Sequence, residues 1–208
     1  MNTPIQDKIL LKIRTNKQGW AFSATDFIKD YKRGDIDVAL SNLAETGAIR
    51  RVMRGIYDYP MFSTILNKIT APDINQVAKA IARKFNWNIF PDGDTALNYL
   101  GLSNQMVAKY IYLSDGASKN YTIGDILLEF KHISKKDAII KDEKSAIVIQ
   151  AIRAMGDKQI TPDFINKLSG KFTNAEWNKI AENAKSATGW IYDIIKQAKN
   201  IAEGTKNG

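Results

Sequence analysis

"AIRRVMRGIYDYP", residues 48–60, is the stretch that decides the predicted fold of the N-terminal part. Its pattern predicts two short strands on either side of Arg54-Gly55, where glycine can take the positive φ of a tight turn. Three arginines, Arg50, Arg51 and Arg54, lie in this hairpin, and packing alone gives no reason for so much positive charge there. We therefore expect the hairpin to contact an anion. Because side chains alternate along a strand, Arg50 and Arg51 should point to opposite faces, so both are not expected to reach one ligand.

Three helices are predicted before the hairpin. The first carries an apolar stripe at helical spacing, and the second, DFIKDY, begins at the capping-box-like sequence SATD of residues 23–26. A very short extended segment, WAF, separates these two. The third helix ends at Gly47 and has a four-residue apolar face, Ile36, Ala39, Leu40 and Leu43. Helix, short strand, helix, turn, helix and hairpin, in this order, predict a winged helix-turn-helix.

This interpretation predicts a DNA-binding surface. The third helix would lay its small and polar outer face against base edges, and the arginines of the hairpin would reach phosphates or the minor groove. Asp35 and Asp37 count against it, because carboxylates repel phosphate. A three-helix protein-contact module with a solvated basic hairpin is the alternative. The predicted DNA-binding residues are Thr25, Lys32, Arg33, Asp37, Ser41, Asn42, Arg50, Arg51, Arg54 and Tyr57.

Charge and composition agree with an anionic partner. The 208-residue chain has a formal net charge of +8. Residues 1–60 hold ten basic and seven acidic residues, residues 61–133 hold seven and six, and residues 134–208 hold thirteen and nine. The chain has no cysteine, which excludes disulfides and cysteine-based metal sites. Neither a signal peptide nor an apolar run of membrane-spanning length is present, so we expect a cytoplasmic protein without membrane contact.

Residues 61–208 are predicted to form a second, α+β domain after a winged helix-turn-helix domain at 1–60. A helix opens at Pro72 and keeps one apolar face to Phe85, and a short helix capped by Asp94 follows. Alternating residues then predict a small antiparallel sheet. From about residue 134 the chain becomes a helical tail, with predicted caps at Thr161 and in TNAE, residues 173–176. The predicted fold class is therefore α+β.

Signals for catalysis are weak. His132 is the only histidine and lies in register with apolar strand positions, so a strand histidine is expected rather than a catalytic one. Asp92-Gly93-Asp94 has a metal-ligand spacing but stands at a turn before a helix, where capping is expected. Tyr110, Tyr112 and Tyr121 are interpreted either as cross-strand packing or as a partner surface. We predict no enzyme, no catalytic or metal-binding residue and no cofactor.

Several segments together resemble a known family. ALSNLAETGAIRRVMRGIYDYP is similar to the winged-helix segment of AbiEi-type antitoxins, in the DUF6088 branch. The LGLS turn, the YLSDG hairpin and the EFKH strand continue the resemblance through about residue 155, and the helical tail matches more loosely. Asn42 is a departure from the family pattern, because Arg is common at this position in the family.

The resemblance implies a transcriptional autorepressor that binds double-stranded DNA at its own operator. It also implies the antitoxin of a type IV toxin–antitoxin, or abortive infection, system that counters a nucleotidyltransferase-like toxin. Two alternatives remain open: a protein-interaction module whose winged helix is only structural, and a degenerate nucleotidyltransferase-like enzyme.

Overall fold

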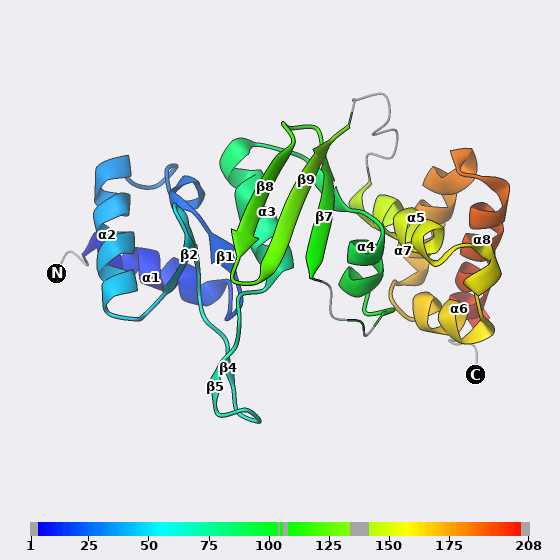
Figure 1. Cartoon of the computed structure of the whole chain (residues 1–208), viewed down its shortest axis with the longest axis horizontal. Coiled ribbons are helices and arrows are strands. Elements are labelled where there is room, and N and C mark those ends of the chain that lie inside the picture. Colours follow the sequence, from blue (N-terminus) through cyan, green and yellow to red (C-terminus); the bar gives the residue numbers. More distant parts are fainter. Residues whose placement is uncertain (1–3, 104, 106–107, 134–141, 205–208) are drawn as a thin grey trace. The chain divides into compact units, whose positions relative to one another are not determined.

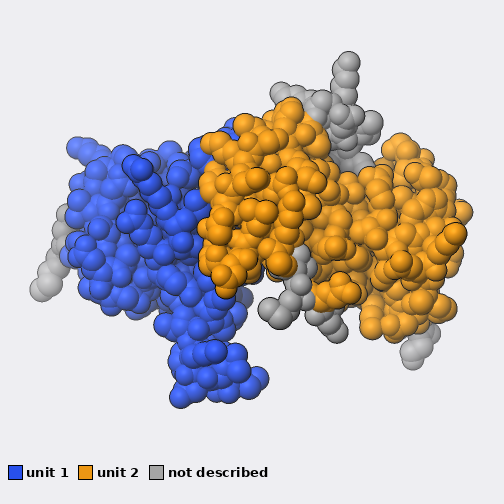
Figure 2. All heavy atoms as spheres, in the orientation of Figure 1, with its two compact units in different colours: residues 1–88 blue, residues 89–208 orange. Residues whose placement is uncertain are grey.

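The computed structural model describes residues 4–103, 105, 108–133 and 142–204 and divides into two compact units (Figures 1 and 2). Unit 1 comprises residues 1–88 and unit 2 comprises residues 89–208. The predicted start of the helical tail, about residue 134, lies outside the described residues. The predicted domain boundary at residue 60 falls inside unit 1, and as a boundary of function it stays a prediction.

Unit 1 is a small antiparallel sheet with helices on it and a separate two-stranded hairpin (Figure 1). The sheet has the strand order β1-β3-β2. The hairpin β4–β5 forms no pairing with it among the described residues. The elements are α1 (Ile5–Thr15), β1 (Ala21–Phe22), the 3-10 turn η1 (Ala24–Asp26), α2 (Arg33–Glu45), β2 (Arg50–Met53), β3 (Ile56–Asp58), β4 (Phe62–Ser63), β5 (Lys68–Ile69) and α3 (Ile74–Phe85).

The predicted second α-helix is not formed. Instead of an α-helix over DFIKDY, the chain makes the single turn η1 and then further turns. Asp26 accepts a hydrogen bond from the backbone N–H of Ser23 (2.9 Å), as a capping box requires. Phe27 then takes φ −121°, outside the helical range, while its side chain is fully buried. Burial of this ring in the core therefore ends the helix after one turn.

The sheet of unit 1 has helices on both faces. Phe22 is buried with apolar residues of α1 and α2 in one cluster, which defines the first face. Its neighbour Ala21 points the opposite way and is also buried. There α3 lies against β1 and β3, and Arg83 of α3 donates to the Ala21 carbonyl (2.7 Å) and to Asp26 (2.7 Å). Unit 1 extends to residue 88 because α3 covers this second face.

Unit 2 begins with a four-stranded sheet and a short helix. The strand order is β6-β7-β9-β8. The outer pairs are antiparallel, as predicted for a small antiparallel sheet, but the central pair, β7 with β9, is parallel. Leu128 and Phe130 of β9 are fully buried, so the most apolar strand takes the interior position and the polar β8 takes the edge. The elements are β6 (Ile89–Pro91), α4 (Asp94–Tyr99), β7 (Lys109–Ser114), β8 (Lys119–Ile123) and β9 (Ile126–His132).

The rest of unit 2 is helical, as predicted. Thr161 caps α6 through the N–H of Phe164 (3.2 Å), and Thr173 and Glu176 form the predicted capping box of α7. The prediction that Asp94 caps the short helix α4 is wrong, because Gly93 is the N-cap and Asp94 is the first residue of the helix. The elements are α5 (Glu143–Met155), η2 (Asp157–Gln159), α6 (Pro162–Ser169), α7 (Asn174–Asn183), η3 (Ala184–Ser186) and α8 (Gly189–Gly204).

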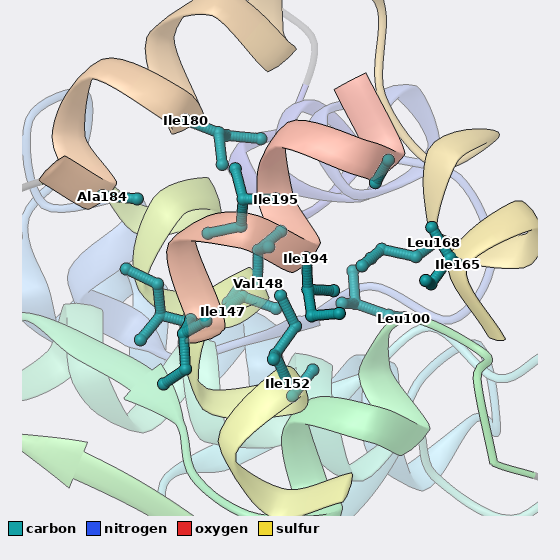
Figure 3. Close-up of a cluster of buried hydrophobic side chains, with 14 of the residues drawn as sticks. Leu100, Ile147, Val148, Ile152, Ile165, Leu168, Ile180, Ala184, Ile194 and Ile195 are labelled. Atoms are coloured by element: carbon teal, nitrogen blue, oxygen red, sulfur yellow. The ribbon is translucent and has the colours of Figure 1, made fainter. Parts of the chain in front are cut away.

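The core of unit 2 lies between these helices (Figure 3). Ile147, Val148 and Ile152 of α5 meet Ile194 and Ile195 of α8 there. The fully buried Trp177 of α7 donates its indole N–H to the carbonyl of Ser169 (2.9 Å), so its polar atom is satisfied. Among the described residues, no helix has the length and apolarity needed to cross a bilayer.

Candidate nucleic-acid interface

Helix α2 presents a polar face to solvent, as its spacing predicts. Ile36, Ala39, Leu40 and Leu43 are buried against the core of unit 1. On the opposite side, Asp37, Val38, Ser41 and Asn42 are all exposed. Val38 is 62% exposed although it is apolar, so this position gains little from packing within the chain. A small apolar side chain between polar ones suits a helix that meets base edges and thymine methyl groups.

Two cations stand at the start of α2. Lys32 is the exposed N-cap residue, and no described residue forms a hydrogen bond or ion pair with its side chain. Arg33 pairs with Asp37 one turn later, with 2.8 Å between Nε and Oδ2. Both of these side chains are more than half exposed, so the pair contributes little to stability and can be exchanged for a phosphate. The Arg33 pair also neutralises Asp37, one of the two carboxylates that oppose DNA.

The polar residues in the middle of α2 have weak local partners. The Ser41 hydroxyl lies 3.4 Å from Glu45 Oε1, and the Asn42 amide donates to Gln6 Oε1 of α1 at 3.3 Å. Both contacts are long and solvent-exposed, so each side chain can turn to another partner at little cost. Gln6 was not predicted as a site residue, and the sequence holds no signal that pairs it with Asn42.

The hairpin β2–β3 has the predicted strands and turn, but its three arginines have different surroundings. Arg50 lies opposite Asp58 in the strand register. It donates two hydrogen bonds to that carboxylate (3.0 and 2.5 Å) and a third to the carbonyl of Thr70 (2.7 Å). The Asp58 side chain is only 2% exposed. Arg50 therefore compensates a buried negative charge, and its guanidinium is occupied within the chain.

Arg51 and Arg54 are exposed, and no described residue forms a hydrogen bond or ion pair with either side chain. Arg51 pairs in register with Tyr57, and Tyr57 with Phe22, so all three lie on the sheet face that α1 and α2 cover. Arg54 occupies the turn with Gly55, whose φ is +74°. Positive charge thus remains available on the α2 side of the sheet and at the tip of the hairpin.

Lys84 adds a cation at the hairpin turn that sequence reasoning missed. Its Nζ lies 3.0 Å from the point that a Cβ on Gly55 would occupy. Lys84 belongs to α3, which follows the hairpin by many residues, so only the packing of α3 along the sheet brings it there. Gly55 is required for its positive φ, whereas the Lys84 ammonium is the end of a flexible side chain that can shift away from a larger residue.

Two predicted residues are largely structural. Tyr57 is half-buried and stacks on Phe22, with 6.2 Å between ring centroids. Thr25 is half-buried in η1, with its hydroxyl 2.6 Å from that of Ser23. The Thr25 hydroxyl therefore has a partner within the turn that precedes α2.

The candidates in unit 2 are explained by packing. Tyr112 is buried beside Phe130, and burial raises the pKa of Tyr121, whose ring packs edge-on against Phe130 at 6.0 Å. His132 ends β9, and its Nδ1 lies 2.8 Å from the Gly116 carbonyl. Asp92 begins the turn into α4, where its carbonyl accepts from the Thr95 N–H (3.1 Å). The contacts of Tyr112 and Tyr121 support the cross-strand interpretation of these two tyrosines.

Comparison with known proteins gives a family without a function. The model of DUF6088, described as a family of unknown function, matches residues 8–179. The match runs through both units, from α1 into α7. No curated protein matches the chain significantly.

Proposed function

The chain belongs to the DUF6088 family, and we propose that it is a DNA-binding transcriptional autorepressor and the antitoxin of a type IV toxin–antitoxin pair. The observation that carries the DNA-binding part is the pair of exposed arginines, Arg51 and Arg54, on the hairpin that follows the polar-faced helix α2. The antitoxin part rests on the resemblance of its segments to AbiEi-type antitoxins.

Unit 1 acts in this proposal as a winged helix-turn-helix. Helix α2 is the recognition helix, and β2–β3 is the wing. The order of α1, η1, α2 and a three-stranded sheet supports it, because η1 and the following turns can replace the second helix of the motif. Ser41 and Asn42 are the residues proposed to meet base edges.

Phosphate binding is assigned to the cations that remain available. These are Lys32 at the N-terminus of α2, and Arg51 and Arg54 of the hairpin. Arg50 leaves the predicted set because its guanidinium is held by Asp58 and Thr70.

Salt dependence of binding to the DNA upstream of the protein's own gene tests this assignment. Each lost phosphate contact lowers the slope of log affinity against log salt by about 0.9 on duplex DNA. Arg51→Ala and Arg54→Ala should each weaken binding and give a shallower slope. The control Lys158→Ala, an exposed lysine of unit 2, should leave both values unchanged. If both arginine variants keep the parental affinity and slope while melting normally, the hairpin is not a DNA wing.

The antitoxin part has a separate test. Cells that express a nucleotidyltransferase-like toxin encoded beside this chain should recover growth when the chain is co-expressed. Arg51→Ala should still rescue them, because the proposal separates DNA binding from toxin neutralisation. No rescue by the parental chain would contradict the antitoxin function and leave the DNA-binding result standing.

A further inference from the structure

The hairpin β4–β5, together with its flanking residues 61–70, is the most apolar exposed segment of unit 1. It stands out from the body of the unit as a separate arm (Figures 1 and 2). We call residues 61–70 the arm. Its large apolar side chains are between 46% and 93% exposed, with Ile65 at the tip highest: Met61, Phe62, Ile65, Leu66 and Ile69.

The arm has regular hydrogen-bonded structure. Its two strands pair Phe62 with Ile69 and Ser63 with Lys68, and Asn67 takes a left-handed conformation at the turn (φ +48°). At the root, the Thr70 N–H donates to the Met61 carbonyl (2.9 Å), and Arg50 donates to the Thr70 carbonyl (2.7 Å). The buried pair of Arg50 with Asp58 thus fixes the arm to the sheet.

The arm has one apolar face. Phe62 and Ile69 lie opposite each other in register and therefore on one side, while Ser63 and Lys68 lie on the other. The tip adds Ile65 and Leu66. A two-stranded hairpin of this size is marginally stable alone in water, and an exposed apolar patch of this kind marks an interaction site.

We infer that the arm is a homodimerisation element that packs its apolar face against the arm of a second copy of this chain. Lys68 is the one charged residue of the arm, and it lies on the face opposite Phe62 and Ile69, so two arms can meet through their apolar faces without placing like charges in the contact. Both strands have edges that no described strand covers, and an antiparallel two-fold contact can use the same edge of each copy.

Area favours the same choice. The five apolar side chains of the arm together present on the order of 500 Å² of exposed apolar surface. This figure assumes that one such side chain presents roughly 150–200 Å² when it is wholly exposed. A specific interface needs about 1,000 Å² in total. Two arms packed against each other would together supply about this area, so a second copy of the arm is sufficient and no further surface is needed.

Topology keeps the arm away from the hairpin turn. Strand β3 starts at the Arg54-Gly55 turn and ends at Asp58, and the arm follows from that far end. The proposed contact uses the apolar face and tip of the arm and none of the arginines of the hairpin, so this inference stands whether or not the hairpin binds DNA.

The test measures the mass of the full chain in solution over a range of concentrations, by light scattering or sedimentation. The parental protein should form a dimer of twice 23.3 kDa. Ile65→Asp and Leu66→Asp should each weaken the dimer at least about 30-fold, as expected for a central apolar anchor. The control is Leu11→Asp, a similarly exposed leucine on α1, which should dimerise normally.

Cross-linking gives an independent readout, because the chain has no cysteine. A single Ile65→Cys should be joined to a second copy by a short bismaleimide, and Leu11→Cys should not. Ile65 and Leu66 are exposed, so unchanged melting is expected and will show that the variants fold. A parental chain that stays monomeric at every concentration, or a dimer that both aspartate variants leave intact, would overturn the inference, and an unlike protein would then be the occupant of the arm.

Discussion

Arg50 and Arg51 are neighbours in the chain, yet only one of them is tied to a buried carboxylate. Alternation along a strand predicts that they face opposite sides, and the structure has them so. Which of the two is paired could not be read from the sequence. That depends on the register that sets Asp58 opposite Arg50, and on α3 and the arm root closing over that side of the sheet.

Truncation of these arginines should therefore separate stability from binding. Arg50→Ala leaves the Asp58 carboxylate buried without a partner, and we expect it to lower the free energy of unfolding by about 2–4 kcal/mol. Arg51→Ala should change it by no more than about 0.5 kcal/mol, as for an ordinary surface site. Urea unfolding measures both values, and Arg50→Ala combined with Asp58→Asn should recover part of the loss. Equal effects of the two single changes would refute the structural role of Arg50.

Several helices and turns that are marked by a capping residue or a turn glycine begin and end where the sequence predicts. The caps at Thr161 and Thr173 start α6 and α7 where predicted, and Gly55 turns the hairpin. Two features escaped because long-range packing decides them. Burial of Phe27 ends the second helix after one turn, and the apolar β9 displaces β8 from the place beside β7. The position of Lys84 beside the hairpin turn escaped for the same reason.

The capping box of α7 gives an acid-sensitive element. Lys144 of α5 donates to the Glu176 carboxylate, and Thr173 donates to it as well, which lowers the pKa of Glu176 to about 2 from 4.5. A lowered carboxyl pKa contributes stability that is present above the unfolded value and is lost as pH falls toward the folded one. The contribution of Glu176 should therefore be complete above about pH 5 and should disappear between about pH 4.5 and 2.

Thermal melting of the parental chain and of Glu176→Gln from pH 7 to pH 2.5 checks this expectation. The parental protein should melt higher at neutral pH, and the two melting temperatures should converge as the acid limit is approached. All other carboxyl groups titrate in both proteins, so the difference isolates Glu176. A gap between the two melting temperatures that stays constant across this range would contradict the assignment.

At the scale of the whole molecule, α3 belongs to the N-terminal unit although it is far from the hairpin in sequence. Its apolar face was predicted, but the surface that it covers was not, because periodicity gives the buried face of a helix and not its partner. The partner is the sheet face that carries Ala21, and Arg83 binds the Ala21 carbonyl and Asp26 from there. A boundary drawn at residue 60 removes this cover.

A fragment of the chain that includes α3 should therefore unfold differently from one that ends before it. Residues 1–88 should melt cooperatively, whereas residues 1–60 should not, because the second face of the sheet and the arm root would lie open to water. Arg83→Ala in the 1–88 fragment is the matched control: it removes the polar ties and keeps the apolar cover, so cooperativity should survive with a lower melting temperature. Circular dichroism and calorimetry measure these differences. If residues 1–60 alone melt as sharply as residues 1–88, then α3 is an accessory to the unit and the fold of the proposed DNA-binding part is complete at the end of its hairpin.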